Sequence, residues 1–163
     1  MAFLFRKKKE KSDCEEIGCC VSGEIIPIEK VGDSIFSTKI LGDGYAVIPC
    51  DSSVYAPVDM TVKDISSDGL SVTGVTADGL NVLINFGINF SQSKKSYVKI
   101  MVKLGDEITR GEKIGEIDYN SAVKEGFDAT VCVVVMNSDN LKTFRSFPSV
   151  SVSHGEKAAE YAI

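Results

Sequence analysis

Short hydrophobic stretches rich in β-branched residues recur along this chain, and glycine or aspartate turn signals separate them. Each stretch spans three to eight residues, which suits a strand and is too short for an ordinary helix. Asp68-Gly69 and Asp78-Gly79 favour hairpin turns because both residue types tolerate positive φ. Many short strands at this spacing are typical of an all-β antiparallel sandwich or barrel. The predicted strands cover residues 24–31, 34–41, 45–49, 54–56, 60–65, 70–75, 80–86, 97–102, 113–117, 129–136 and 150–152.

Helical patterns are scarce in the same sequence. One short helix is predicted over residues 120–125, directly after Asp118. A second is predicted over residues 139–145, with Ser138 as its N-cap. The expected fold class is therefore all-β, an antiparallel sandwich with one or two short helices.

The segment GDEITRGEKIG, residues 105–115, resembles the turn and strand of barrel-sandwich hybrid domains, the architecture of biotinyl and lipoyl carriers. Those carriers hold their modified lysine at a hairpin tip, in a context such as Met-Lys-Met. This chain has no equivalent of that context. The segment therefore supports a sandwich of the barrel-sandwich hybrid type and not a carrier function.

The first twenty residues differ in charge from the rest. Residues 1–11 carry a net charge of +4, and since the whole chain carries −5, the remainder carries −9. We predict a basic, disordered tail over residues 1–20 and a single domain over residues 21–163, because this length suits one domain rather than two. An acidic domain repels phosphate backbones, so nucleic-acid binding is not expected.

The tail begins with a very short apolar run ahead of its basic residues, the reverse of a secretion signal, so a cytoplasmic location is expected. The longest charge-free run, residues 79–93, is too short and too polar to be a transmembrane helix. Two interpretations of the tail stay open. It is either a solubilising extension or a weak contact with the inner face of a membrane through Phe3, Leu4, Phe5, Arg6, Lys7, Lys8 and Lys9.

Five cysteines and one histidine offer little to a metal or redox site. No cysteine pair has the C-x-x-C spacing, so neither a metal nor another cofactor is expected. Without a secretion signal the thiols should stay reduced. Cys132 lies in an apolar run and is predicted to be buried, whereas Cys14, Cys19 and Cys20 fall in the predicted tail.

Five collinear blocks carry a family resemblance: SGEI at 22–25, KILGDGYAV at 39–47, APVD at 56–59, GLNVLINFGIN at 79–89 and VSHGE at 152–156. Together they resemble the glucose-type IIA component of the bacterial phosphoenolpyruvate-dependent sugar phosphotransferase system, over residues 21–156. One block alone would be a weak indication, but five in order identify the chain as a member of this family. The resemblance implies the family's fold, an antiparallel sandwich built from a duplicated hybrid motif.

The resemblance also implies a reaction. In the family, a histidine takes a phosphoryl group from the carrier HPr and passes it to a IIB domain, and a second histidine assists. The resemblance places Asn85 at the phosphoacceptor position and Leu70 at the assisting position. An amide nitrogen has its lone pair delocalised into the carbonyl, unlike an imidazole nitrogen, and leucine offers no polar atom. Docking without phosphotransfer is therefore expected, and no catalysis.

A partner-binding face follows from the same resemblance. Apolar residues with a polar border are typical of such a face. The expected partners are HPr, a IIB domain or a sugar permease. Ser66 and Ser91 make the border more polar than is usual in the family. The expected binding residues are Asp33, Ile35, Phe36, Ile40, Leu41, Asn85, Asn89 and Phe90.

Three functions stay open from the sequence. The first is a non-phosphorylatable binding or regulatory variant, which we favour because the expected nucleophile is missing. The second is an active phosphocarrier with an unexpected acceptor, for which the single histidine, His154, is the candidate. The family's order places His154 in a turn away from the strand of Asn85. The third is a structural remnant without partners.

Overall fold

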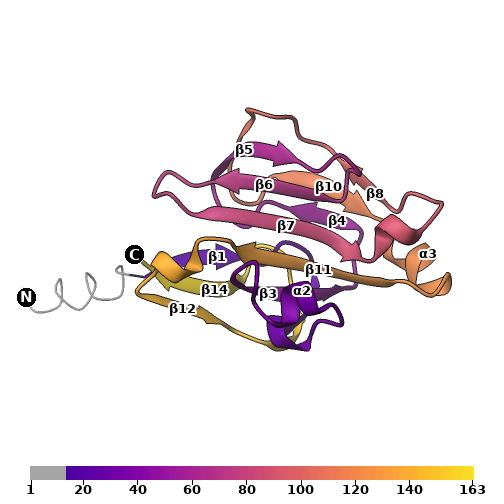
Figure 1. The fold of residues 1–163 in the computed structure, drawn as a ribbon, viewed down its shortest axis with the longest axis horizontal. Helices are drawn as coiled ribbons and strands as arrows, with labels where there is room; N and C mark the ends of the chain where they lie inside the picture. Colours follow the sequence, from indigo (N-terminus) through magenta and orange to yellow (C-terminus); the bar gives the residue numbers. More distant parts are fainter. Residues whose placement is uncertain (1–13) are drawn as a thin grey trace, which may run out of the picture.

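The computed structural model describes residues 14–163 and consists mainly of antiparallel strands (Figure 1). These residues form one eight-stranded sheet and two three-stranded sheets, which confirms the predicted all-β antiparallel sandwich with short helices. The elements in chain order are β1 (Glu15–Gly18), β2 (Gly23–Pro27), η1 (Ile28–Lys30), α2 (Ser34–Ser37), β3 (Asp43–Pro49), β4 (Ser53–Tyr55), β5 (Met60–Ile65), β6 (Ser71–Val75), β7 (Asn81–Ile88), η2 (Phe90–Gln92), β8 (Val98–Ile100), β9 (Glu107–Ile108), β10 (Lys113–Ile117), α3 (Tyr119–Lys124), β11 (Asp128–Val135), η3 (Ser138–Asn140), β12 (Thr143–Ser146), β13 (Ser149–Val152) and β14 (Lys157–Ala162).

Strand β11 is a central strand of the large sheet, whose order is β13-β2-β3-β11-β7-β6-β5-β9. It pairs with β3 along one edge and with β7 along the other. All of its residues after Asp128 are buried. A continuous apolar run of this kind suits a strand that is covered on both faces. In Figure 1 the strands β5, β6 and β7 lie in the upper half of the molecule, and β11 and β3 lie in the lower half.

Two hydrophobic clusters form the core, and β11 contributes to both. Val131, Val133 and Val135 join the larger cluster, whereas Cys132 and Val134 join the smaller one. Successive side chains of a strand point to opposite faces of the sheet, which explains this division. The smaller cluster is completed by Ile28, Val31, Phe36, Ala46 and Ile88.

The two helix predictions have opposite outcomes. The helix expected over residues 120–125 is present as α3, and the side chain of Asp118 accepts a hydrogen bond from the Ser121 N–H at 3.2 Å. The helix expected over residues 139–145 is wrong. Only the short turn η3 forms, and the chain then enters β12, where Phe144 lies opposite Tyr161 of β14. Pairing with β14 satisfies the backbone groups of this segment in a way that local propensity does not indicate.

The strand expected over residues 34–41 is also wrong. One helical turn, α2, forms instead, and the Asp33 carboxylate caps it by accepting a hydrogen bond from the Ile35 N–H at 2.9 Å. Lys39 then adopts φ 60°, a left-handed conformation that no strand contains. The turn buries Phe36 in the smaller cluster, and Ile35 stays half exposed at 50%.

Residues 15–20, expected to belong to the tail, lie inside the folded domain. Strand β1 pairs with β14, with Glu15 opposite Tyr161, and Ile17, Cys19 and Cys20 are buried in the larger cluster. This corrects the predicted boundary, which rested on the basic composition further upstream. The two ends of the described chain therefore lie side by side (Figure 1). The rest of the predicted tail, including the predicted membrane contact at residues 3–9, lies outside the described residues.

Three aromatic rings, those of Phe90, Tyr97 and Phe127, pack together after the end of β7. The ring of Phe90 lies 5.2 Å from that of Tyr97 and 6.2 Å from that of Phe127, measured between centroids. Phe90 also covers Gly87, whose φ is +80°, and a Cβ atom there would lie 2.2 Å from Cε2 of Phe90. Phe90 is 4% exposed and is therefore a core residue.

Cysteine labelling tests the corrected boundary. Burial raises the pKa of the Cys19 thiol to about 11 and that of Cys132 to about 12, and raises the pKa of Cys20 well above its usual value. Because the thiolate is the reactive form, these raised pKa values suppress reaction at mildly alkaline pH. We expect a disulfide reagent to label the exposed Cys50 rapidly in the native protein, and the three buried thiols only after denaturant is added.

The control for this experiment is a Cys14→Ser/Cys50→Ser variant, which should show no fast phase. Rapid labelling of two thiols in this background would place Cys19 and Cys20 outside the folded domain and contradict the structure.

Substitution of Phe90 tests whether this side chain stabilises the core or belongs to the surface. Phe90→Ala is expected to lower the free energy of unfolding by about 3–5 kcal/mol, because it opens a cavity in the aromatic group. Ile40→Ala should change it by no more than about 0.5 kcal/mol, because Ile40 is 77% exposed. Urea unfolding followed by circular dichroism measures both values. Equal effects of the two substitutions would refute the assignment of Phe90 to the core.

Candidate functional site

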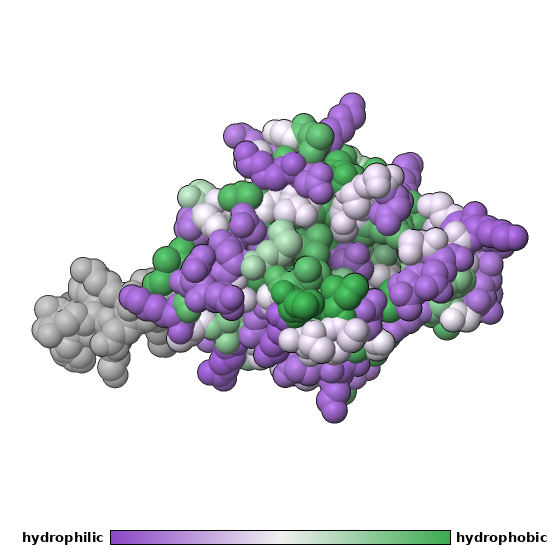
Figure 2. Space-filling view, in the orientation of Figure 1, coloured by the Kyte–Doolittle hydropathy of each residue, from purple (hydrophilic) through white to green (hydrophobic). Residues whose placement is uncertain are grey.

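A shallow depression of about 290 Å³ brings together most of the residues that the sequence singled out. It lies where α2, the turn between β5 and β6, the second half of β7 and η2 meet. Figure 2 shows hydrophobic residues gathered over α2 on this side of the molecule. The depression is lined by Asp33, Ile35, Phe36, Ser66, Asp68, Leu70, Ser71, Asn85, Gly87, Ile88, Asn89, Phe90 and Ser91.

Asn85 lies in the middle of strand β7, between two partner strands. It is opposite Ser71 of β6 on one side and opposite Cys132 of β11 on the other. Its side chain is half-buried, and its Nδ2 donates a hydrogen bond to the Gly87 carbonyl oxygen at 2.8 Å. The amide can donate and accept hydrogen bonds, but it has no nitrogen lone pair available for a covalent bond to phosphorus.

Leu70 lies just before β6, next to the strand position that faces Asn85. Its carbonyl oxygen accepts a hydrogen bond from the Phe86 N–H at 2.8 Å, which fixes this turn to β7. Its side chain is half-buried against the larger core cluster. The position therefore contributes an apolar wall to the depression and no group that could transfer a proton or contact a phosphoryl oxygen.

Two carboxylates border the depression, and hydrogen bonds hold both in place. Asp33 caps α2 as described above. Asp68 accepts a hydrogen bond from the Ser66 hydroxyl at 2.6 Å and one from the Leu70 N–H at 3.1 Å. No lysine, arginine or histidine is among the residues that line the depression. The depression is therefore acidic and polar at its border and apolar on the α2 side.

The negative charge extends to the sheet beneath Asn85. The pKa of the Cys132 thiol is raised to about 12, first by burial and then by the carboxylates of Asp128 and Asp33. Asp128 is itself held by Thr130, whose hydroxyl donates to Asp128 Oδ1 at 2.6 Å. Carboxylates on two different elements therefore act on the strand that pairs with β7.

The residues expected to bind a partner divide into three groups. Asp33, Asn85 and Asn89 reach the depression with polar groups, and Ile35 reaches it as a half-exposed apolar residue. Phe36 and Phe90 also line it, but at 7% and 4% exposure they belong mainly to the core. Ile40 and Leu41 are not among the lining residues and lie beyond α2. Asp68, which the sequence indicated only as a turn residue, also lines the depression.

His154 is not among the residues of this depression. It lies in the turn between β13 and β14, and its ring stacks on that of Tyr55 with centroids 3.9 Å apart and planes 18° apart. The side chain is exposed. The structure thus holds the single histidine of the chain against β4, and Asn85 lies in β7.

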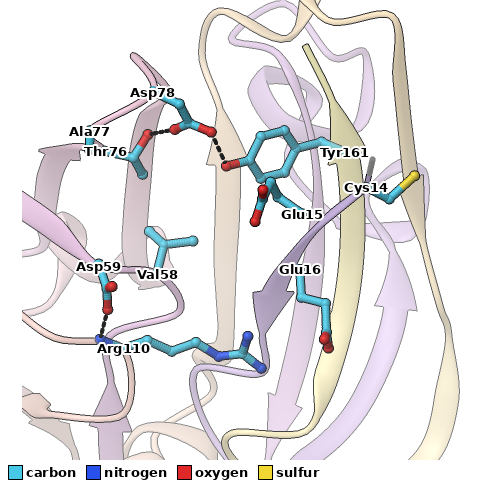
Figure 3. Close-up of a pocket in the computed structure, with 10 residues that line it drawn as sticks. All are labelled: Cys14, Glu15, Glu16, Val58, Asp59, Thr76, Ala77, Asp78, Arg110 and Tyr161. Atoms are coloured by element: carbon cyan, nitrogen blue, oxygen red, sulfur yellow. Dashed lines mark hydrogen bonds between the residues drawn. The ribbon is translucent and has the colours of Figure 1, made fainter. Parts of the chain in front are cut away.

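A larger cavity of about 660 Å³ lies where the described chain begins, between β1, β14 and three turns (Figure 3). The Tyr161 hydroxyl donates to Asp78 Oδ2 at 2.7 Å, and the Thr76 hydroxyl donates to the other Asp78 oxygen. Burial and Asp78 raise the pKa of Tyr161, so the phenol stays protonated and serves as a donor. The Arg110 guanidinium donates to the Gly155 carbonyl at 2.9 Å. None of the expected site residues lines this cavity, so its size alone does not make it the functional site.

The described residues contain neither a metal-binding cluster nor a membrane-spanning helix. Among residues 14–163 no group of three or more histidine, cysteine, aspartate or glutamate side chains is arranged to hold a metal ion. No helix in that range has the length and apolar character needed to cross a membrane.

Comparison with known proteins places this chain in a family. Residues 15–141 match the model of the family described as phosphoenolpyruvate-dependent sugar phosphotransferase system, EIIA 1. The chain is 31% identical over 138 residues to the glucose-specific EIIA component of Haemophilus influenzae, covering 85% of this chain and 83% of that protein. It is 31% identical over 137 residues to the glucose-specific EIICBA component of Staphylococcus carnosus, covering 84% of this chain but only 20% of that longer protein.

A solved structure agrees on the fold. Glucose permease IIA from Mycoplasma capricolum superimposes with a TM-score of 0.78 at 21% sequence identity, covering 90% of this chain and 95% of that one. Together with the family match, this confirms the resemblance on which sequence analysis relied. The chain belongs to the EIIA 1 family of the phosphoenolpyruvate-dependent sugar phosphotransferase system.

Proposed function

We propose that this protein is a IIA-type component of sugar uptake that docks onto phosphotransferase-system partners without accepting a phosphoryl group. The observation that supports the proposal most directly is Asn85. The resemblance assigns the phosphoacceptor to this position, and the amide there donates to the Gly87 carbonyl within the depression.

Phosphoryl acceptance needs a nucleophile and a way to stabilise the transferred charge. A histidine provides the first through a ring nitrogen with a lone pair near neutral pH. Neighbouring hydrogen-bond donors or cations provide the second. At the two expected positions this protein has an amide and the apolar side chain of Leu70, and no cationic side chain lines the depression. The site therefore lacks the nucleophile and any cation that would stabilise the transferred charge.

Docking needs only a matching surface, and the depression retains the features of one. An apolar area at α2, where Ile35 is 50% exposed, borders the polar groups of Asp33, Asn85 and Asn89. Apolar contacts surrounded by polar groups are the usual composition of a transient protein interface. The candidate partners are HPr, a IIB domain and a sugar permease. Relatives named as EIICBA components and as a lactose permease are longer proteins in which the matching segment is about one fifth of the chain.

The location belongs to the same proposal. We place the protein in the cytoplasm, where HPr and the IIB domains of sugar permeases meet it. A peripheral contact with the inner membrane face through residues 3–9 would bring it closer to a permease, and this contact falls on residues that the structure does not describe.

A phosphotransfer assay tests the missing nucleophile. We would incubate the protein with phosphoenolpyruvate, enzyme I and HPr, and record the intact mass at alkaline pH, where phosphohistidine survives. The natural protein is expected to keep its mass. An Asn85→His/Leu70→His variant is expected to gain one phosphoryl group, because the two substitutions restore the nucleophile and its neighbour on an unchanged scaffold.

An Asn85→Gln/Leu70→Met variant serves as the matched control, since it changes the same positions without adding an imidazole. A phosphoryl group on the natural protein would refute the proposal. His154→Asn would then show whether the single histidine is the acceptor. If the Asn85→His/Leu70→His variant also gains no phosphoryl group, the protein does not dock to HPr and the partner assignment is wrong.

A further inference from the structure

We infer that the depression prefers a partner whose phosphorylatable side chain carries no phosphate, and that phosphorylation of that side chain weakens binding. The inference rests on the proposed function and adds to it a discrimination between two forms of the same partner. A protein with this property would respond to how much of its partner is phosphorylated, without itself taking part in the transfer.

The fixed charges of the depression oppose a phosphate. Its lining includes the carboxylates of Asp33 and Asp68 and no cationic side chain. Neither carboxylate can rotate away without losing a hydrogen bond. Asp33 accepts one from the Ile35 N–H, and Asp68 accepts one from the Ser66 hydroxyl. A phosphate bound in the depression would meet the like charge of both carboxylates, and like-charge contacts in an interface disfavour binding strongly.

Three hydrogen-bond donors of the depression are already engaged. One side-chain N–H of Asn85 is bound to the Gly87 carbonyl oxygen. The Leu70 N–H and the Ser71 N–H are both bound to the Ser66 hydroxyl oxygen, at 3.1 Å and 3.0 Å. A phosphate would have to break these bonds to use these three donors, which leaves it the side-chain donors of Ser71, Asn89 and Ser91 and no cationic donor. Neutral donors of this kind offset the loss of water around a phosphate only in part.

The charge behind the depression has the same sign. Asp128 and Asp33 both act on Cys132, which pairs directly with Asn85 across the sheet. Lys39, which follows α2, forms ion pairs with Glu29 and Asp43 at 3.8 Å and 3.5 Å. This lysine contributes no lining atom to the depression. The negative potential of the site is thus not neutralised by the side chains that line it.

The apolar part of the surface contacts the phosphorylated and unphosphorylated forms of a partner equally. Ile35 and Ile40 are 50% and 77% exposed and offer contact area to either form of a partner. Attraction through this area is the same for both forms, and the repulsion acts on the phosphorylated form alone. The preference is therefore a difference in affinity created by a repulsive element, the usual basis of specificity between similar ligands.

Binding measurements with two forms of one carrier test the inference. The probes are HPr and HPr phosphorylated by enzyme I and then purified, each titrated into the natural protein at mildly alkaline pH by calorimetry. We expect phosphorylated HPr to bind about tenfold more weakly or worse. The ratio of the dissociation constants of phosphorylated and unphosphorylated HPr should fall as salt is added, because screening reduces the repulsion. Mass spectrometry after each titration verifies that the phosphoryl group stayed on HPr.

Two variants assign the effect to the depression. Asp68→Asn removes one charge and keeps an oxygen acceptor. It should therefore bring the dissociation constants for phosphorylated and unphosphorylated HPr closer together. Asn85→Lys adds a cation at the centre and should strengthen binding of the phosphorylated form selectively. The matched control is Glu107→Gln, which removes one charge from the exposed edge strand β9, outside the depression. This control should leave the ratio unchanged.

The outcomes separate the inference from the proposed function. Equal or tighter binding of phosphorylated HPr overturns the inference and leaves docking intact. Binding of neither form overturns docking to this carrier, and the inference fails with it. A ratio that Asp68→Asn and Glu107→Gln change equally would show that overall charge, and not the depression, discriminates between the two forms.

Discussion

The pairing of β11 with both β3 and β7 is the constraint on which the rest of this structure depends. β11 is buried on both faces, and its backbone is hydrogen-bonded along both edges. Because successive side chains alternate between two clusters, a shift of one residue would exchange their contents. The same register places Cys132 beside Asn85, so the position of the site is fixed by core packing and not by the residues of the site itself.

A sharp turn at the end of β7 forms one wall of the depression. Gly87 and Asn89 both have positive φ, which turns the chain sharply after Asn85. The turn carries Phe90 back over Gly87 and into contact with Tyr97, so that the wall of the site is also part of the core. On the opposite side, Asp33 begins the helical turn that presents Ile35. The depression is thus formed by backbone conformations that packing holds in place.

Local pattern predicted those parts of the fold whose structure is decided locally. Strands β5 and β10 have the predicted bounds because each is a short segment with β-branched apolar residues, separated from the next segment by clear turn signals. Strands β1, β12 and β14 were missed because they depend on pairing between the two ends of the domain, where KAAEYA shows little strand propensity. In the site, family resemblance brought Asp33, Asn85 and Asn89 together, but it could not show that Phe36 and Phe90 face the core. It also could not show that Asp68 turns toward the depression.

Shape and reactivity depend on different residues in this site. The shape depends on Gly87, Asn89, Phe90 and the helical turn at α2, none of which would take part in bonding to phosphorus. Under the proposed function, reactivity depends on the side chain at position 85 and on its neighbour at position 70. The Asn85 amide fits this shape because its Nδ2 donates one hydrogen bond to the Gly87 carbonyl oxygen. Substitution at these two positions can therefore remove phosphotransfer while the surface that a partner meets keeps its form.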